Sequence, residues 1–465
     1  MLNRRQMFIR SAKGFGGLAL ASMLAEETGH AAVDASKAKA KSIIYIFNHG
    51  GVSHVDTFDP KPTLTRLSGE TVPASFAQGL KTSRIDFRKA IMRGSPWQFP
   101  KHGHGGLEIS TLFPHLSQHA DKLAVIRSCY SEAFDHAPAM FHSCTGSQFP
   151  GRPSLGAWLS YGLGSENKNL PSYVVMSDGA MKSGAGAYGS GFLPATYQGT
   201  IFRSGKSPVL NLASPDKVTT QAQRETLDFI NDLNRGHYAS REEDTALDAR
   251  IRSYELAFRM QAEAPGVVDI STESEATQKL YGIDQPMTAD FGRKCLLARR
   301  LVERGVRSVQ LFFGTNLGDD WDDAHNDLLG SHNKMAKKSD QPIAALLTDL
   351  AARGLLDQTL VVWNSEFGRT PLAEGKNGRD HHPYGYAMWM AGAGIQGGRA
   401  LGATDEFGLR ATEDRKSIHD VHATILRILG IDHLQLTWRY QSRDMRLTDV
   451  HGEGEFTNWL YQQKA

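Results

Sequence analysis

The sequence is poor in cysteine, in surplus charge and in long apolar runs. Only 3 of its 465 residues are cysteine, and none of them stands in a CxxC motif, which excludes a disulfide framework and a thiolate metal site. Its 52 Lys and Arg residues against 50 Asp and Glu leave a net charge of +2, whereas a dedicated nucleic-acid-binding protein carries a concentrated basic surplus. No stretch of the mature chain has the roughly 20 apolar residues that span a bilayer. We therefore expect no nucleic-acid partner and no stable membrane span.

Two further motifs are missing where they would matter. No GxGxxG directly follows an expected strand, and GxxxxGK[ST] does not occur, which disfavours dinucleotide and phosphate-loop enzymes. Against these shortages the chain has 18 histidines. A metal site in this protein would therefore be built from imidazole and carboxylate.

The first 32 residues predict an export signal. Arg4-Arg5 is a twin-arginine pair ahead of a short, weakly apolar stretch from Gly14 to Ala25, and small residues end at Ala32. A positive segment, a short apolar segment and small residues make a signal peptide, and the twin-arginine form is bacterial. We expect export to the periplasm by the twin-arginine machinery. The alternative is a basic amphipathic helix of the domain.

The remaining chain, residues 33–465, predicts one α/β domain with an insertion around 180–265. Short runs rich in β-branched and aromatic residues alternate with helical patterns, which is typical of a doubly wound, mostly parallel sheet with helices on both faces. The expected strands are 43–47, 123–126, 173–176, 306–313, 360–363 and 387–390. The expected helices are 155–163, 287–304 and 342–353.

Clusters of carboxylate and imidazole follow these strands or lie beside them. In open α/β sheets, ligands bind beyond the carboxyl ends of the strands, so the clusters should converge. Each cluster alone could be a turn or a helix cap, and His49, His54 and His422 are weaker candidates. The strongest candidates are Asp56, His136, Asp322, Asp323, His325, Glu366, His381 and His382.

Mixed imidazole and carboxylate ligands suit zinc, iron or manganese, while an all-oxygen site would suit calcium or magnesium. One or two such ions would stabilise the oxygens of an ester hydrolysis. Arg369 and Arg379 could grip a phosphate or sulfate as a bidentate fork. The alternative for each arginine is a structural ion pair.

Several long motifs resemble a known family. Gly50-Gly51-x-Ser53-His54-x-Asp56-Thr57-Phe58-Asp59-Pro60, Pro150-Gly151-Arg152-Pro153-Ser154, Glu366-Phe367-Gly368-Arg369-Thr370-Pro371, Gly378-Arg379-Asp380-His381 and His419-Asp420-x-His422 resemble the bacterial "domain of unknown function 1501" family. Many planctomycete-type members of that family are labelled sulfatase. The family is similar to the alkaline phosphatase and sulfatase superfamily.

The resemblance implies a metal site with recognisable departures. Asn48 stands where the superfamily usually has an Asp ligand, so that Asp56 would substitute from the next loop. His136 stands at the nucleophile position, where a sulfatase has Cys or Ser. Glu366 replaces an Asp, and His381 or His382 matches a late metal-binding His. Asp322 or Asp323, with His325, resembles an Asp…His pair.

The sequence therefore predicts an exported, metal-dependent hydrolase of sulfate or phosphate esters. Its cofactor would be one or two divalent ions (zinc, manganese or calcium), and its substrate a small molecule or a polysaccharide ester. Attack would come from a metal-bound hydroxide or from His136, with Arg369 holding the anion. The alternative is a non-catalytic exported binding or assembly protein that retains the fold.

Overall fold

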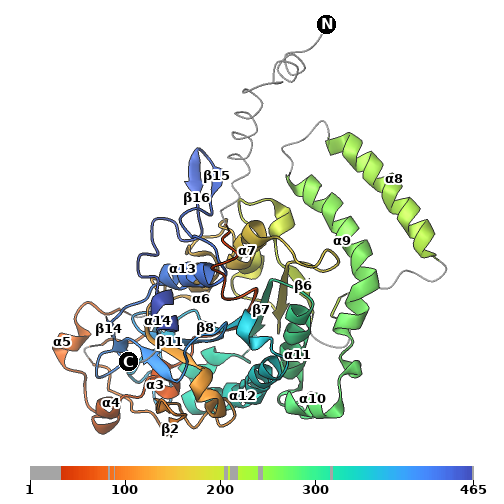
Figure 1. Cartoon of the computed structure of the whole chain (residues 1–465). Coiled ribbons are helices and arrows are strands. Elements are labelled where there is room, and N and C mark those ends of the chain that lie inside the picture. The colour runs from red at the N-terminus through yellow and green to blue at the C-terminus, as the bar shows by residue number, and fades with distance from the viewer. Residues whose placement is uncertain are drawn as a thin grey trace.

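The computed structural model describes residues 33–81, 84–87, 89–203, 208–209, 218–238, 245–314 and 318–462. The expected export signal lies outside these residues. At the centre is an eight-stranded sheet (Figure 1). In spatial order its strands are β12 (Arg399–Leu401), β4 (Ala124–Cys129), β11 (Tyr386–Gly392), β8 (Thr359–Ser365), β1 (Ser42–Asn48), β7 (Ser308–Phe313), β5 (Tyr173–Ser177) and β6 (Thr200–Phe202).

The sheet is parallel except at one strand. β1 pairs in parallel with β7 and β8, while β11 runs antiparallel between β8 and β4. The six expected strands are present within a few residues of their expected ends. The short strands β6 and β12 were not expected from the sequence, because three residues are too few to show a pattern. The predicted doubly wound, mostly parallel sheet is confirmed.

Both faces of the sheet are buried, as the sequence predicted. Along β1, Ile44 and Ile46 pack into one core, while Ile43, Tyr45 and Phe47 pack into another. Alternate residues of a strand point to opposite faces, so helices cover both sides. Residues of α9, α11 and α12 contribute to the first core, and residues of α6, α7 and α13 to the second.

The longer helices are α6 (His136–Thr145), α7 (Leu155–Leu163), α8 (Thr220–Tyr238), α9 (Thr245–Val268), α11 (Ala289–Glu303), α12 (Leu328–Ala352) and α13 (Ile418–Ile428). Shorter helices are α3 (His54–Thr57), α4 (Pro62–Arg66), α5 (Ala74–Ala77), α10 (Glu275–Leu280) and α14 (Thr457–Tyr461). Short antiparallel pairs join β2 (Lys101–His102) to β3 (Leu107–Glu108), β9 (Gly368–Arg369) to β10 (His381–His382), β13 (Ala403–Thr404) to β14 (Ala411–Glu413), and β15 (Trp438–Tyr440) to β16 (Arg443–Met445). The 3-10 turns that matter below are η2 (Gly184–Tyr188) and η5 (Trp321–His325).

One expected helix differs from the sequence prediction in where it begins. The helix expected at 342–353 begins at Leu328, because Asp327 caps it by accepting from the Gly330 amide and Pro342 is accommodated inside it. Helix α13 begins at Ile418, where Ser417 and Asp420 form a capping box. Capping residues thus set both helix starts.

Two features of the fold frame the site. Helix α8 lies along α9, away from the sheet, within the segment expected as an insertion (Figure 1). The carboxyl ends of β1, β7, β8 and β5 share one edge of the sheet.

In the part of the chain that the structure describes, no helix has the length and apolarity to cross a bilayer.

Candidate metal centre

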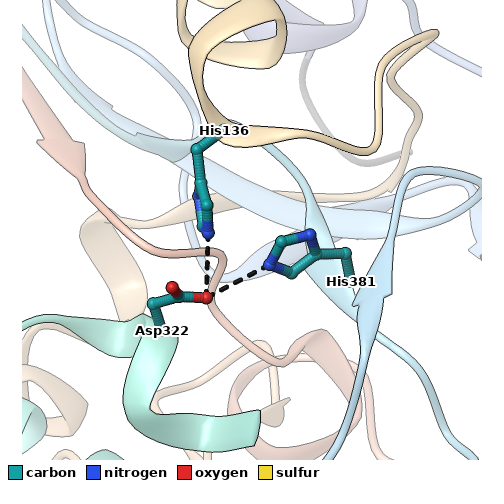
Figure 2. A group of neighbouring side chains, drawn as sticks. All are labelled: His136, Asp322 and His381. Carbon is teal, nitrogen blue, oxygen red and sulfur yellow. Dashed lines mark hydrogen bonds and ion pairs between the residues drawn. The ribbon is translucent and has the colours of Figure 1, made fainter. Parts of the chain in front are cut away.

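Three histidines and one aspartate meet at the carboxyl edge of the sheet. His136 is the first residue of α6, Asp322 and His325 lie on η5, which follows β7, and His381 opens β10. The Asp322 Oδ1 atom lies 2.8 Å from His136 Nε2, 3.1 Å from His381 Nε2 and 3.4 Å from His325 Nε2. Figure 2 shows the His136 and His381 rings pointing at this one oxygen.

The other nitrogen of each ring is held by an acceptor. His136 Nδ1 lies 2.9 Å from Glu366 Oε1, His325 Nδ1 contacts Glu374, and His381 Nδ1 lies 2.7 Å from the Phe134 carbonyl oxygen. Carbonyl and carboxylate oxygens accept, so each Nδ1 carries the hydrogen and donates. In a neutral imidazole the Nε2 then presents a lone pair.

Lone pairs therefore face one another at the centre of the cluster. His325 Nε2 lies 2.9 Å from His381 Nε2, and His136 Nε2 approaches Asp322 without the alignment of a hydrogen bond. Four electron-rich atoms this close repel each other unless a cation lies among them. With zinc bonds of about 2.0–2.1 Å, neighbouring ligands of a tetrahedral ion stand about 3.3 Å apart, near the distances found. The residues present thus fit a divalent metal.

The arrangement also matches how proteins orient metal-binding histidines. A ligating histidine donates its second ring N–H to a carboxylate or backbone carbonyl, which fixes the tautomer. Glu366, Glu374 and the Phe134 carbonyl supply these acceptors for the three rings. Glu366 is completely buried and also accepts from the Gly50 amide at 2.8 Å. Glu366 thus contacts His136, whereas the sequence predicted it as a direct metal ligand.

The charges of the cluster reflect this crowding. Burial lowers the pKa of His136, but the neighbouring carboxylates of Asp322 and Glu366 outweigh burial and raise it. Burial raises the pKa of Asp322, but the three histidines and Arg369 hold it far below its usual value. Burial lowers the pKa of His381 to about 3. The Asp322 carboxylate therefore stays ionised at the centre of the cluster.

A second grouping of possible ligands overlaps the first. His325, Asp380 and His381 also bring ligand atoms together. Because His325 and His381 already point their Nε2 atoms at Asp322, the two groupings share their side chains. The described residues therefore provide one well-formed site for an ion, with Asp380 at its margin.

Arg369 lies beneath Asp322 and not at an open surface. Its side chain is fully buried and donates to the carbonyls of Gly50, Gly51 and Arg379, as well as to Asp322 Oδ1 at 2.7 Å. The Arg369 guanidinium therefore donates its hydrogen bonds to groups inside the protein. The anion-holding role expected for Arg369 does not fit this position, and the structural alternative does.

Lys182 is the cation on the accessible side of the centre. Its Nζ lies 2.9 Å from Asp322 Oδ2, and the lysine and aspartate side chains are 29 % and 24 % exposed. No sequence pattern marks Lys182, because it stands in a Gly-rich segment without a recognised motif. Glu374 was missed for the same reason.

Three expected ligands lie elsewhere. Asp56 forms a fully buried ion pair with Arg379, 2.8 Å away. The Asp323 carboxylate contacts none of the three histidines, so Asp322 is the member of that pair at the centre. His382 donates to the Leu409 carbonyl and stacks on His54 with ring centroids 5.9 Å apart. The pleat of β10 explains the last case, since His381 and His382 point to opposite faces.

His49 joins the site from the end of β1. Its ring stacks on that of His136 with centroids 5.7 Å apart, and its Nδ1 lies 3.1 Å from Asp320 Oδ2. Its buried Nε2 has no hydrogen-bond partner. If Nδ1 donates to Asp320, Nε2 presents a free lone pair next to the cluster.

Comparisons with known proteins give a family and a set of remote structural neighbours. The PsFucS1 sulfatase from Pseudoalteromonas sp. aligns at 12 % identity over 84 % of this chain and 68 % of its own, with a TM-score of 0.37. A TAB5 alkaline phosphatase mutant aligns at 10 % identity over 84 % of this chain and 98 % of its own, with a TM-score of 0.37. A protein from the metabolism of multiple glycosaminoglycans by Bacteroides thetaiotaomicron aligns at 13 % identity over 91 % of this chain and 77 % of its own, with a TM-score of 0.35.

These likenesses are too distant to transfer an activity. No curated protein matches the sequence. One family model, described as "Protein of unknown function (DUF1501)", matches residues 40–455, which covers the sheet, the helices on its two faces and every residue of the metal centre. The chain therefore belongs to this family.

Proposed function

We propose that the protein is a metal-dependent hydrolase of sulfate or phosphate esters. The observation that carries the proposal is the convergence of three oriented Nε2 atoms on one Asp322 oxygen. His136, His325, His381 and Asp322 would hold one divalent ion, with zinc the best match to this ligand set and manganese or iron next. When bound, such an ion polarises an ester oxygen and acidifies a water molecule.

Lys182 is the residue that we assign to the ester anion. It is the cation at the accessible side of the cluster, and its three ammonium hydrogens exceed the single contact to Asp322. Moving from Asp322 Oδ2 toward a sulfate or phosphate oxygen needs only rotation of a flexible side chain. The buried Arg369 side chain holds Asp322 in place by an ion pair, which makes Arg369 a positioning residue.

His49 is the residue that we assign to accept a proton. Asp320 orients its ring, leaving Nε2 free beside His136. His136 itself is engaged at both ring nitrogens, by Glu366 and by Asp322. We therefore prefer His136 as a ligand over His136 as a nucleophile.

Elemental analysis and turnover test the proposal together. Purified protein should contain about one equivalent of transition metal and hydrolyse 4-nitrophenyl sulfate or 4-nitrophenyl phosphate. Asp322→Asn should lose both properties, while Asp323→Asn, a neighbour of the same chemistry on η5, should keep them. A stable wild-type protein without metal would contradict the proposal and favour a binding or assembly protein. Metal without turnover of either ester would contradict the enzyme.

We also propose export through the twin-arginine route, on the strength of Arg4-Arg5 and the small residues before Ala32. Esters outside the cytoplasm would then be the accessible substrates. Cell fractionation tests this, since Arg4→Lys with Arg5→Lys should leave the protein in the cytoplasm. Equal periplasmic amounts of both forms would refute it.

A further inference from the structure

A cleft lies beside the metal centre at the same edge of the sheet. It has a volume of about 460 Å³ and runs between the segment after β5 and strand β6. Its wall includes Val175, Met181, Tyr188, Ile201 and Phe202. Small-molecule sites usually measure about 300–1,000 Å³ and are mostly apolar, so the cleft has the size and lining of a ligand site.

The cleft and the metal centre share a wall. Met181 lines the cleft, while the next residue, Lys182, reaches Asp322 with its Nζ. Neighbouring Cα atoms are about 3.8 Å apart, so a ligand against Met181 lies within one lysine side chain of the cluster. A molecule that occupied the cleft could therefore present a group to Lys182 across the rim.

The charge left over in the cleft is positive. Asp178 is neutralised by Lys294 and accepts from the Gly314 amide at 2.8 Å. The Arg203 guanidinium has no hydrogen-bond or ion-pair partner among the described residues. Among the described residues Arg203 is thus an unpaired cation of the cleft, while Lys182 lies at the rim and pairs with Asp322.

We propose that this cleft is the subsite for the alcohol part of the ester substrate. That part is an aromatic or bulky alkyl group, and it carries a carboxylate or a second, negatively charged sulfate or phosphate ester that pairs with Arg203. The inference rests on the proposed hydrolase function for the identity of the ligand. The apolar wall argues against a strongly hydrated sugar as the occupant.

Kinetics with two esters test the subsite. Wild-type protein should have at least a tenfold lower KM for 4-nitrophenyl phosphate than for methyl phosphate. Ile201→Glu, which places a negative charge on the cleft wall, should raise the KM for the aryl ester about tenfold. Thr200→Glu is the matched control, because Thr200 is the neighbour of Ile201 on β6 and does not line the cleft.

A binding experiment separates this inference from the proposed activity. 2-Naphthoate, an aromatic carboxylate, should bind the metal-loaded protein with a fluorescence change that Arg203→Gln and Ile201→Glu each weaken at least fivefold. Binding without any ester turnover would support the cleft and refute the hydrolase. Turnover with equal KM values for the two esters, and no naphthoate binding, would overturn the cleft.

Discussion

Replacing Glu366 by glutamine should weaken metal binding without unfolding the protein. Glu366 is completely buried, and its Oε1 lies 2.9 Å from His136 Nδ1. Burial raises the pKa of Glu366, but the hydrogen bond and charge of His136 outweigh burial and lower it to about 2. The carboxylate is therefore ionised, and it makes the His136 ring a better electron donor at Nε2.

The size of the effect follows from what glutamine keeps and loses. The amide oxygen of the new side chain can still accept from Gly50 and His136, so the volume and most hydrogen bonds survive while the charge disappears. Loss of such an outer partner typically costs 10–100-fold in metal affinity, which corresponds to about 1.4–2.7 kcal/mol. Glu374→Gln should give a similar loss through His325.

The assay is a competition titration of the metal-depleted protein against a chromogenic chelator. Glu132→Gln is the control, because it removes an exposed carboxylate four residues before His136 that contacts none of the three rings. Circular dichroism checks that each variant is folded. A folded Glu366→Gln protein with wild-type metal affinity would refute the assignment of His136 as a ligand oriented by Glu366.

Three further outcomes follow from the same contacts. In metal-depleted protein, Asp322→Asn should lower the free energy of unfolding by about 3–5 kcal/mol, because the buried Arg369 guanidinium loses its carboxylate. The control Asp323→Asn should change the free energy of unfolding by no more than about 0.5 kcal/mol. Equal effects of the two variants in urea unfolding would contradict this prediction. Asp56→Asn should also lower the free energy of unfolding by about 3–5 kcal/mol, because the buried Arg379 guanidinium loses its carboxylate partner. The metal content should not change, so that metal loss in the folded variant would show that Asp56 is a ligand. Acid should destabilise the protein through histidines buried in the neutral form, whose pKa burial lowers from 6.5 to about 4, 4 and 3: His142, His419 and His422. Below about pH 6.5 the unfolded chain binds protons that the folded chain does not, so the free energy of unfolding falls as the pH is lowered toward about 4, by up to about 1.4 kcal/mol per pH unit per histidine. His142→Gln should therefore make the free energy of unfolding, measured in urea, depend less on pH between about pH 7 and 5. An unchanged pH dependence would exclude His142 from the effect.

The sequence predicted the sheet well because its strands are buried on both faces. Runs such as Ile43–Phe47 are apolar throughout, and only a central parallel strand needs that pattern. The antiparallel direction of β11 was not predictable, because direction depends on the connection and not on apolar periodicity. The start of α12 was missed because its first turns carry polar residues and the helix continues through Pro342.

The site was predicted in part for a similar reason. Strand ends place His136, Asp322, His325 and His381 at one edge, and proximity in the fold follows from that rule. The rule does not say which of two adjacent residues faces the centre, as Asp322 with Asp323 and His381 with His382 illustrate. Nor does it find Lys182 or Glu374, which reach the centre from loops whose paths no local pattern encodes.

The spacing of the metal ligands along the chain has a consequence for how the folded state is held. His325 and His381 are 56 residues apart, and His136 is 230 residues from its partner Glu366. All three cysteines are buried and unpaired, so no disulfide closes these loops. An ion at the centre would tie α6, η5 and β10 together as a cross-link does, reducing the freedom of the unfolded chain. Metal release would then be the step that opens the molecule, and a chelator would act on this protein much as a reductant acts on a disulfide-bonded one.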